Sequence, residues 1–288
     1  RPAVDVRDMN TNMPPDLLAI GHVAKDLTAD GHVIGGAVTY AALTAQALGL
    51  NAVVVTSCGS DVDPYAAMPG IPIHIVPSPD TTTFINTYQD GRRRQILKDV
   101  GGKIRGADIP SAWRGAPLIM LGPMAQELDE SILDSLRAEL VVASIQGWLR
   151  KWNELGEVSP TVWNGATLLP HVSVAIFSDD DSPTVAQIDE WARVCSTLVH
   201  THGGDGCRVY SDGAWRHVPA FPTDEVDPTG AGDVFATAYL IRFRESNDPV
   251  DAAIFASCAA SFCVGAEGVA GIATRGQIDE RLRQSRNS

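Results

Sequence analysis

The chain has 288 residues, and its 22 Lys and Arg against 35 Asp and Glu give a formal net charge of −13. Hydrophobic residues make up 44% of the chain and charged residues 20%, an ordinary globular composition that excludes a disordered or fibrous protein. The longest basic run, Arg92 to Arg94, is too short to hold a phosphate backbone, so we expect no nucleic-acid partner.

The N-terminal segment and the cysteines bear on domain organisation and compartment. Residues 1–13 contain no apolar run, so we expect a flexible lead followed by one domain over residues 14–288. The five cysteines are odd in number and widely spaced, without a CxxC motif, which favours a reducing cytoplasm over a disulfide framework. Residues 31–60 carry no charge, but glycines divide them into a helix and a strand, so we expect no membrane span.

The first half of the chain contains apolar segments with the periods of strands and helices. Strands are predicted over residues 17–23, 51–57, 71–77, 116–123 and 140–147, helices over 37–48 and 127–140, and a short polar segment over 26–33. Residues 81–100 alternate apolar and polar positions around Gln89-Asp90-Gly91. This pattern predicts a β-hairpin, because Asp-Gly tolerates the positive φ of a type I′ turn.

The second half continues the alternation of strands and helices. Strands are predicted over residues 172–178 and 196–203, an antiparallel pair over 207–220, and helices over 182–195, 230–246 and 250–266. Repeated strand-helix units predict an α/β fold with a doubly wound, mainly parallel sheet and helices on both faces.

The run Asp227-Pro228-Thr229-Gly230-Ala231-Gly232-Asp233 carries the chemistry. Its small residues open a helix whose first N–H groups lack internal partners and lie at the positive end of the helix dipole, which suits a phosphoryl group. Asp233 follows the glycines and is placed to accept a hydroxyl proton. The same residues also suit a plain helix start, with Thr229 as the cap.

The segment DPTGAGDVFATAYL closely resembles the C-terminal signature of the PfkB/ribokinase family of carbohydrate kinases, and further landmarks follow in the family's order from about Leu17 to Ile278. The resemblance implies a ribokinase-like fold with a small β lid from residues 24–34 and 83–100. It also implies an ATP-dependent kinase that phosphorylates a hydroxyl group on a small sugar or polyol. Gly35-Gly36-Ala37 and the GHVAKDL opening favour the inositol-kinase-like branch.

In this family Asp233 would be the general base, with the N–H groups of Gly230, Ala231 and Gly232 stabilising the transferred charge. Substrate residues carried over by the resemblance are Asp26, Gly35, Gly36, Tyr40 and, on the hairpin, Asn86. Tyr40 departs from the family, which usually has Asn four positions after the second glycine. Taken alone, Asp26 also fits a solvated loop acid, and Asn86 an exposed strand residue.

Nucleotide and cation residues follow from the same resemblance. Thr201, Gly203 and Gly206 match a T-x-G-x-x-G nucleotide loop, although an ordinary turn has the same composition. Asp181 takes the place of Glu in the family's N-x-x-E motif, which acts through water on Mg²⁺, with Ser178 in place of Asn; an acidic helix cap also fits. Asp227 and Thr229 match positions that bind K⁺ in potassium-activated members.

Two histidines, His200 and His202, lie at strand spacing on one face. This spacing suits a metal pair, but no third ligand is evident in the sequence, so we expect structural histidines.

Other classes fit the sequence less well. A dehydrogenase fingerprint fails because Phe235 stands at the third glycine position and no strand precedes the run, and the motifs of P-loop, serine-hydrolase and zinc-hydrolase enzymes do not occur. A nucleoside or vitamin-precursor kinase of the same superfamily, or a non-catalytic sugar-binding module, remains open. The family also implies homodimers formed through the lid.

Overall fold

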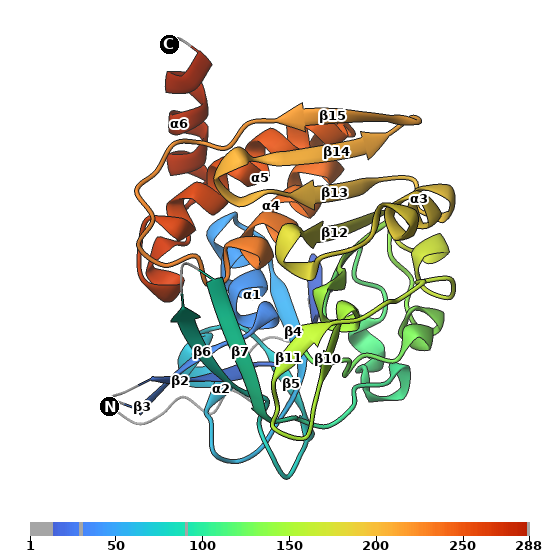
Figure 1. Cartoon of the computed structure of the whole chain (residues 1–288), viewed down its shortest axis with the longest axis vertical. Coiled ribbons are helices and arrows are strands. Elements are labelled where there is room, and N and C mark those ends of the chain that lie inside the picture. The colour runs from blue at the N-terminus through green and yellow to red at the C-terminus, as the bar shows by residue number, and fades with distance from the viewer. Residues whose placement is uncertain (1–13, 29–30, 90–91, 287–288) are drawn as a thin grey trace.

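The structure, a computed structural model, describes residues 14–28, 31–89 and 92–286 (Figure 1). The expected flexible lead over residues 1–13 and the turn at Asp90-Gly91 lie outside these ranges.

A nine-stranded sheet forms the centre of the molecule, in the order β15-β14-β13-β12-β9-β8-β1-β4-β5. Neighbours from β5 to β13 pair in parallel, while β14 and β15 pair antiparallel at one edge, so the predicted α/β class with a mainly parallel sheet is confirmed. The strands are β1 (Leu17–Gly21), β4 (Ala52–Cys58), β5 (Ile73–Pro77), β8 (Leu118–Gly122), β9 (Leu140–Ser144), β12 (Val174–Ser178), β13 (Leu198–Thr201), β14 (Cys207–Ser211) and β15 (Ala214–Val218).

Both faces of the central parallel strands β1, β4, β8 and β12 are buried, as their continuous apolar sequences require. Leu17 and Ala19 of β1 point into a core shared with α1, α4 and α5, while Leu18 and Ile20 point into the opposite core, beside α3. The helices are α1 (Ala37–Ala47), α2 (Pro64–Ala67), α3 (Val185–Val194), α4 (Ala231–Ser246), α5 (Pro249–Val264) and α6 (Arg275–Arg286). None of the helices in the described ranges combines the length and apolar character needed to cross a bilayer.

A second sheet lies to one side of the large one, in the order β3-β2-β6-β7 (Figure 1). Its strands are β2 (Ala24–Thr28), β3 (Gly31–Gly35), β6 (Thr83–Gln89) and β7 (Arg92–Asp99). The described residues of the polar segment, 26–28 and 31–33, therefore belong to the antiparallel pair of β2 and β3, and β2 pairs in parallel with β6. These strands come from the two segments for which a lid is expected.

Residues 127–140 do not form the predicted α-helix. The structure has only a 3₁₀ segment, Glu130–Ser135, followed by extended chain into β9. Tertiary bonds explain the difference, because the amide of Arg137 donates to the Arg114 carbonyl at 2.8 Å and the Glu139 amide donates to the Pro117 carbonyl at 2.8 Å. A short pair, β10 (Arg150–Trp152) and β11 (Val158–Pro160), was not predicted either.

Trp191 on α3 packs in the core that contains Leu18 and Ile20. Its side chain is fully buried, packs edge-on against Phe177 with ring centroids 5.2 Å apart, and donates from Nε1 to the Trp163 carbonyl at 3.2 Å.

Replacing Trp191 with Ala should lower the free energy of unfolding by about 3–5 kcal/mol, because the cost of the cavity adds to the cost of the lost contacts. Chemical denaturation measures the change.

Val185 on the same helix is 75% exposed and provides the control. V185A should change the free energy of unfolding by less than about 0.5 kcal/mol, as surface substitutions usually do. Equal losses in W191A and V185A would contradict the packing described for α3.

Candidate active site

Helix α4 begins at the glycine run singled out in the sequence. Gly230 is the N-cap and has a φ of +79°, in the left-handed region that glycine adopts without strain. Ala231 donates to the Pro228 carbonyl at 3.3 Å and Asp233 donates to the Gly230 carbonyl at 3.0 Å, while within the described residues the amides of Gly230 and Gly232 have no acceptor. Open space surrounds the Gly232 α-carbon, so an anion can approach this helix end.

The Tyr40 ring packs directly on Gly230. A Cβ at Gly230 would lie 2.2 Å from Cε1 of Tyr40, and a Cβ at Gly268 would lie 3.9 Å from its hydroxyl oxygen. Tyr40 is only 3% exposed, so it fills the space between α1 and the start of α4. The residue that departs from the family therefore lies within the predicted site.

Three predicted carboxylates gather around Tyr40. Burial raises the pKa of Tyr40 well above its usual range, and the negative charges of Asp227, Asp233 and Asp26 raise this pKa further. These acids lie on the loop before α4, on α4 and on β2, so the fold brings residues about two hundred positions apart into electrostatic range. Burial, with Asp233 and Asp227, also raises the pKa of the Cys263 thiol to about 12.

The predicted glycine pair lies against the turn that joins the two sheets. Gly36 has a φ of +95°, and a Cβ there would lie 2.5 Å from the His22 carbonyl oxygen. A Cβ at Gly35 would lie 3.0 Å from Oδ2 of Asp26. Gly36 thus requires glycine, whereas a side chain at Gly35 would displace the carboxylate of Asp26, the acid expected to hold substrate.

Asp26 lies in a hydrogen-bonded row across the small sheet. Asn86 on β6 donates from Nδ2 to Asp26 Oδ1 at 2.8 Å, and Gln95 on β7 donates to Asn86 Oδ1 at 2.8 Å. Asp26 and Asn86 are both half-buried. Because Gln95 donates to the amide oxygen, the Nδ2 group of Asn86 is turned toward Asp26, and the Asp26 carboxylate is held in one orientation.

Asp227 joins the loop before α4 to the loop after α5. Its Oδ1 accepts from the Thr229 amide at 2.9 Å and its Oδ2 accepts from the Gly268 amide at 3.0 Å. The side chain of Asp227 and the backbone of Gly268 are therefore adjacent, and a role toward K⁺ stays a prediction.

Asp181 lies in the turn after β12, where it closes a capping box with Ser178. Its Oδ2 accepts from the Ser178 amide at 2.7 Å and from the Ser178 hydroxyl at 2.9 Å. The residue is 6% exposed, and this burial raises the pKa of its carboxyl group. The carboxylate is thus engaged in the turn, and a role toward Mg²⁺ stays a prediction.

The predicted nucleotide loop follows β13 as a 3₁₀ turn, Gly203–Asp205. Gly203 has a φ of +53° and faces open space, whereas a Cβ at Gly206 would lie 2.1 Å from the Val218 carbonyl oxygen. The Thr201 hydroxyl donates to the Phe177 carbonyl at 3.3 Å. The loop therefore leaves its backbone open at Gly203 and is held to β15 at Gly206.

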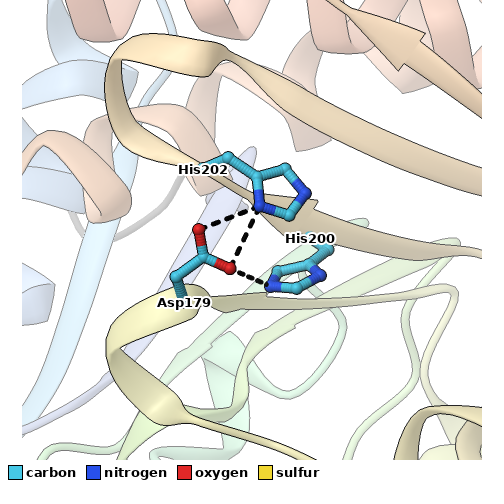
Figure 2. A group of neighbouring side chains, drawn as sticks. All are labelled: Asp179, His200 and His202. Carbon is cyan, nitrogen blue, oxygen red and sulfur yellow. Dashed lines mark hydrogen bonds and ion pairs between the residues drawn. The ribbon is translucent and has the colours of Figure 1, made fainter. Parts of the chain in front are cut away.

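His200 and His202 have a third neighbour that the sequence analysis missed. Asp179, in the turn after β12, lies 2.8 Å from His200 Nε2 and 2.9 Å from His202 Nδ1 (Figure 2). Burial and the adjacent His202 lower the pKa of His200, while the Asp179 carboxylate acts in the opposite direction. The parallel pairing of β12 with β13 brings these residues together, because Ser178 lies opposite Thr201.

Glu127 is a second residue that sequence reasoning missed, since it was assigned to a helix. It is 1% exposed, and its carboxylate accepts from the amides of His22 at 3.1 Å, Met124 at 3.0 Å and Ala125 at 2.8 Å. His22 itself is fully buried beside Gly36. Glu127 thus fixes the chain just after β1, against which Gly36 packs, to the turn after β8.

The sequence model described as pfkB family carbohydrate kinase matches residues 171–274. This range includes the predicted nucleotide loop and the start of α4, whereas Asp26, Tyr40 and Asn86 lie before it. Inositol 3-kinase of Zea mays is 29% identical over 261 residues, which cover 83% of this chain and 68% of the maize protein. Cytidine kinase of Thermococcus kodakarensis is 25% identical over 259 residues, covering 79% of this chain and 88% of that protein.

A solved pyrophosphate-dependent kinase in the ribokinase family, complexed with a pyrophosphate analog and myo-inositol, superposes with a TM-score of 0.76 at 22% identity, over 92% of this chain and 99% of that chain. The large sheet and the glycine-opened helix thus define a protein with the ribokinase fold. The match over residues 171–274 and the likeness to inositol 3-kinases support a PfkB carbohydrate kinase of the inositol-kinase-like branch, and a kinase of this family implies ATP use. The chain spans about two thirds of the maize relative's length.

The contact between Tyr40 and Gly230 can be tested by stability. G230A should lower the free energy of unfolding by roughly 2–5 kcal/mol, because Ala costs about 1–2 kcal/mol in the left-handed region and overpacking the ring costs about 1–3 kcal/mol. G232A should instead raise the free energy of unfolding by up to about 1 kcal/mol, because Gly232 is helical and faces open space. Denaturant unfolding of both variants measures the contrast.

A double-mutant cycle with Y40A separates the two costs in G230A. The loss of unfolding free energy in Y40A/G230A should be smaller than the sum of the losses in Y40A and G230A, by roughly 1–3 kcal/mol. Removing the ring relieves its clash with the methyl group introduced at position 230, while the backbone strain at that position remains. Strict additivity would show that the ring and the glycine are not in contact.

Proposed function

We propose that this chain transfers a phosphoryl group from ATP to a hydroxyl group of a small sugar or polyol, with cyclic polyols of the inositol class as the preferred acceptors. The observation that carries the proposal is the gathering of Asp26, Asp227 and Asp233 around Tyr40, beside the open amides of α4. Such a transfer needs one carboxylate to hold the acceptor and a second to accept the proton of its hydroxyl group. It also needs a helix end to stabilise the charge on the transferred group.

In this proposal Asp233 accepts the proton of the attacking hydroxyl group. The amides of Gly230 and Gly232 stabilise the negative charge on the transferred group; the Ala231 amide contributes less, because it already donates to the Pro228 carbonyl. Removing the proton as the oxygen attacks makes the hydroxyl a better nucleophile.

The acceptor lies against Gly35 and Gly36, with the Asp26 carboxylate taking hydrogen bonds from its hydroxyl groups. Asn86 holds that carboxylate through its 2.8 Å hydrogen bond, and Tyr40 limits the depth of the site next to Gly230. A ring of hydroxyl groups suits such a site, since one carboxylate accepts two of them at once. The name of the maize relative and the myo-inositol in the solved complex support this acceptor class.

The donor nucleotide lies along the loop of Thr201, Gly203 and Gly206. Mg²⁺ would be held mainly by the donor phosphates, with Asp181 acting through water, and would neutralise phosphate charge. K⁺ would lie at Asp227, Thr229 and the 266–271 backbone, whose adjacency suits an oxygen-ligated cation. Because the solved relative is pyrophosphate-dependent, ATP and pyrophosphate are both tested as donors.

The four-stranded sheet would serve as the lid, closing over the acceptor and excluding water. Val33 on β3 is 55% exposed and would lie in a homodimer contact between two lids. The proposed location is the cytoplasm, and an overall charge of −13 makes a nucleic-acid partner unfavourable.

The base assignment is tested by D233N. Turnover with ATP and the best acceptor from a panel of sugars, polyols and nucleosides should fall roughly 10²- to 10⁴-fold, because a general base is lost. A coupled ADP-release assay measures turnover, with pyrophosphate consumption followed in parallel. D279N on α6, where the acid is exposed, is the control and should retain full turnover.

Full turnover in D233N would refute the role given to Asp233. Preference for a nucleoside over every polyol would show that the acceptor is a nucleoside, as the name of the Thermococcus kodakarensis relative indicates for that protein. Binding of a polyol without product formation, with either donor, would favour a non-catalytic module.

The acceptor contact is tested by D26N. The KM for the acceptor should rise about 10- to 150-fold, since a hydrogen bond to a charged group contributes about 1.5–3 kcal/mol, while the KM for ATP should stay unchanged. D99N, at the end of β7 in the same sheet, is the matched control. Equal effects of D26N on both KM values would contradict a role confined to the acceptor.

A further inference from the structure

Asp179, His200 and His202 form a cluster that the proposed phosphoryl transfer does not use. His200 lies on β13, His202 directly follows that strand, and Asp179 begins the turn after β12. Each side chain offers one ligand atom, and the three atoms lie within 4.8 Å of one another. Figure 2 shows both imidazole rings with a nitrogen turned toward the Asp179 carboxylate.

The hydrogen bonding of this cluster is incomplete. His202 Nδ1 lies 3.0 Å and 2.9 Å from the two carboxylate oxygens, but its Nε2 is buried and finds no partner in the described ranges. His200 Nε2 lies 2.8 Å from Asp179 Oδ1 without the alignment of a hydrogen bond. Buried polar atoms without a partner are rare in folded proteins, and an ion bound at His200 Nε2 would satisfy that atom.

We infer that Asp179, His200 and His202 bind a late first-row divalent metal ion of the Zn²⁺ class, in a site separate from the Mg²⁺ of the nucleotide. Two imidazole nitrogens and one carboxylate are a Zn²⁺ ligand set, whereas Mg²⁺ prefers oxygen ligands. Ligands about 2.1 Å from one ion lie roughly 3.4 Å apart in tetrahedral geometry, so small side-chain rotations bring the three atoms into place.

The surroundings of the cluster favour such a site. The His200 ring is held between Phe177, with centroids 4.6 Å apart, and His202, with centroids 4.1 Å apart, so little ordering is needed on binding. The side chains of His200 and His202 are 15% and 21% exposed, whereas that of Asp179 is 61% exposed, which gives the ion an entry path from solvent.

An ion in this site would link the two loops that carry it. His202 is the second residue of the Thr201–Gly206 loop, and Asp179 lies two residues before Asp181. Three protein ligands leave a fourth position for water or another small ligand. Whether the ion binds does not depend on the proposed kinase activity, so the two can fail separately.

The test uses the full chain, stripped with a chelator and titrated with Co²⁺ without nucleotide. The expected result is one Co²⁺ per chain with visible d–d absorption, no sulfur-to-cobalt charge-transfer band, and displacement by Zn²⁺ but not by excess Mg²⁺. H202A and D179N should each weaken Co²⁺ binding by at least ~10- to 100-fold, because losing even a residue that only supports a ligand costs that much. H200A/H202A should abolish Co²⁺ binding.

H171A, whose histidine is exposed on the segment before β12, is the control and should bind Co²⁺ as tightly as the unaltered chain. H202Q provides a second, milder variant, and thermal unfolding without metal checks that every variant is folded. No stoichiometric Co²⁺ binding, undiminished binding by H200A/H202A, or displacement by Mg²⁺ would each overturn the inference.

Discussion

The close packing of the Tyr40 ring on Gly230 sets the geometry on which the candidate active site depends. The 2.2 Å separation between the ring and a Cβ at Gly230 means that α1 and α4 approach this closely only because Gly230 has no side chain. Tyr40 lies four residues after Gly36, and Gly230 begins α4. One contact therefore fixes the spacing between the glycine pair proposed for the acceptor and the amides proposed for the transferred phosphoryl group.

Charge in this region is divided between backbone and side chains. The nearby acids, Asp26, Asp227 and Asp233, are carboxylates, while Tyr40 and Cys263 are held neutral by burial. The open amides of α4 supply partial positive charge without adding a cationic side chain. An acidic protein with a charge of −13 can in this way attract phosphate at one point while its overall field repels polyanions.

Local patterns in the sequence predicted the parts of the fold that depend on neighbouring residues. The apolar strands and helices α1 and α4 follow from periodicity, and the small residues around Gly230 predict the start of α4, whereas Gly36 is identified only through the family resemblance. Long-range contacts decided the rest. Residues 127–140 have a helical pattern, but Arg137 and Glu139 donate to carbonyls of another segment, and Glu127 is drawn into the core by three amides. Asp179 meets the two histidines only through strand register, which single-residue patterns do not encode.

The burial of all five cysteines has a consequence for studying motion in this protein. The thiols of Cys58, Cys195, Cys207, Cys258 and Cys263 are all free and covered in the native fold. A thiol reagent can therefore reach each one only when its own region opens, and the rate of labelling reports that opening. Cys263, whose thiol lies 3.7 Å from the Thr229 carbonyl, would report on the loop before α4, and Cys195 on the far side of the sheet. The chain thus carries five natural probes of local unfolding, spread over both faces of one sheet.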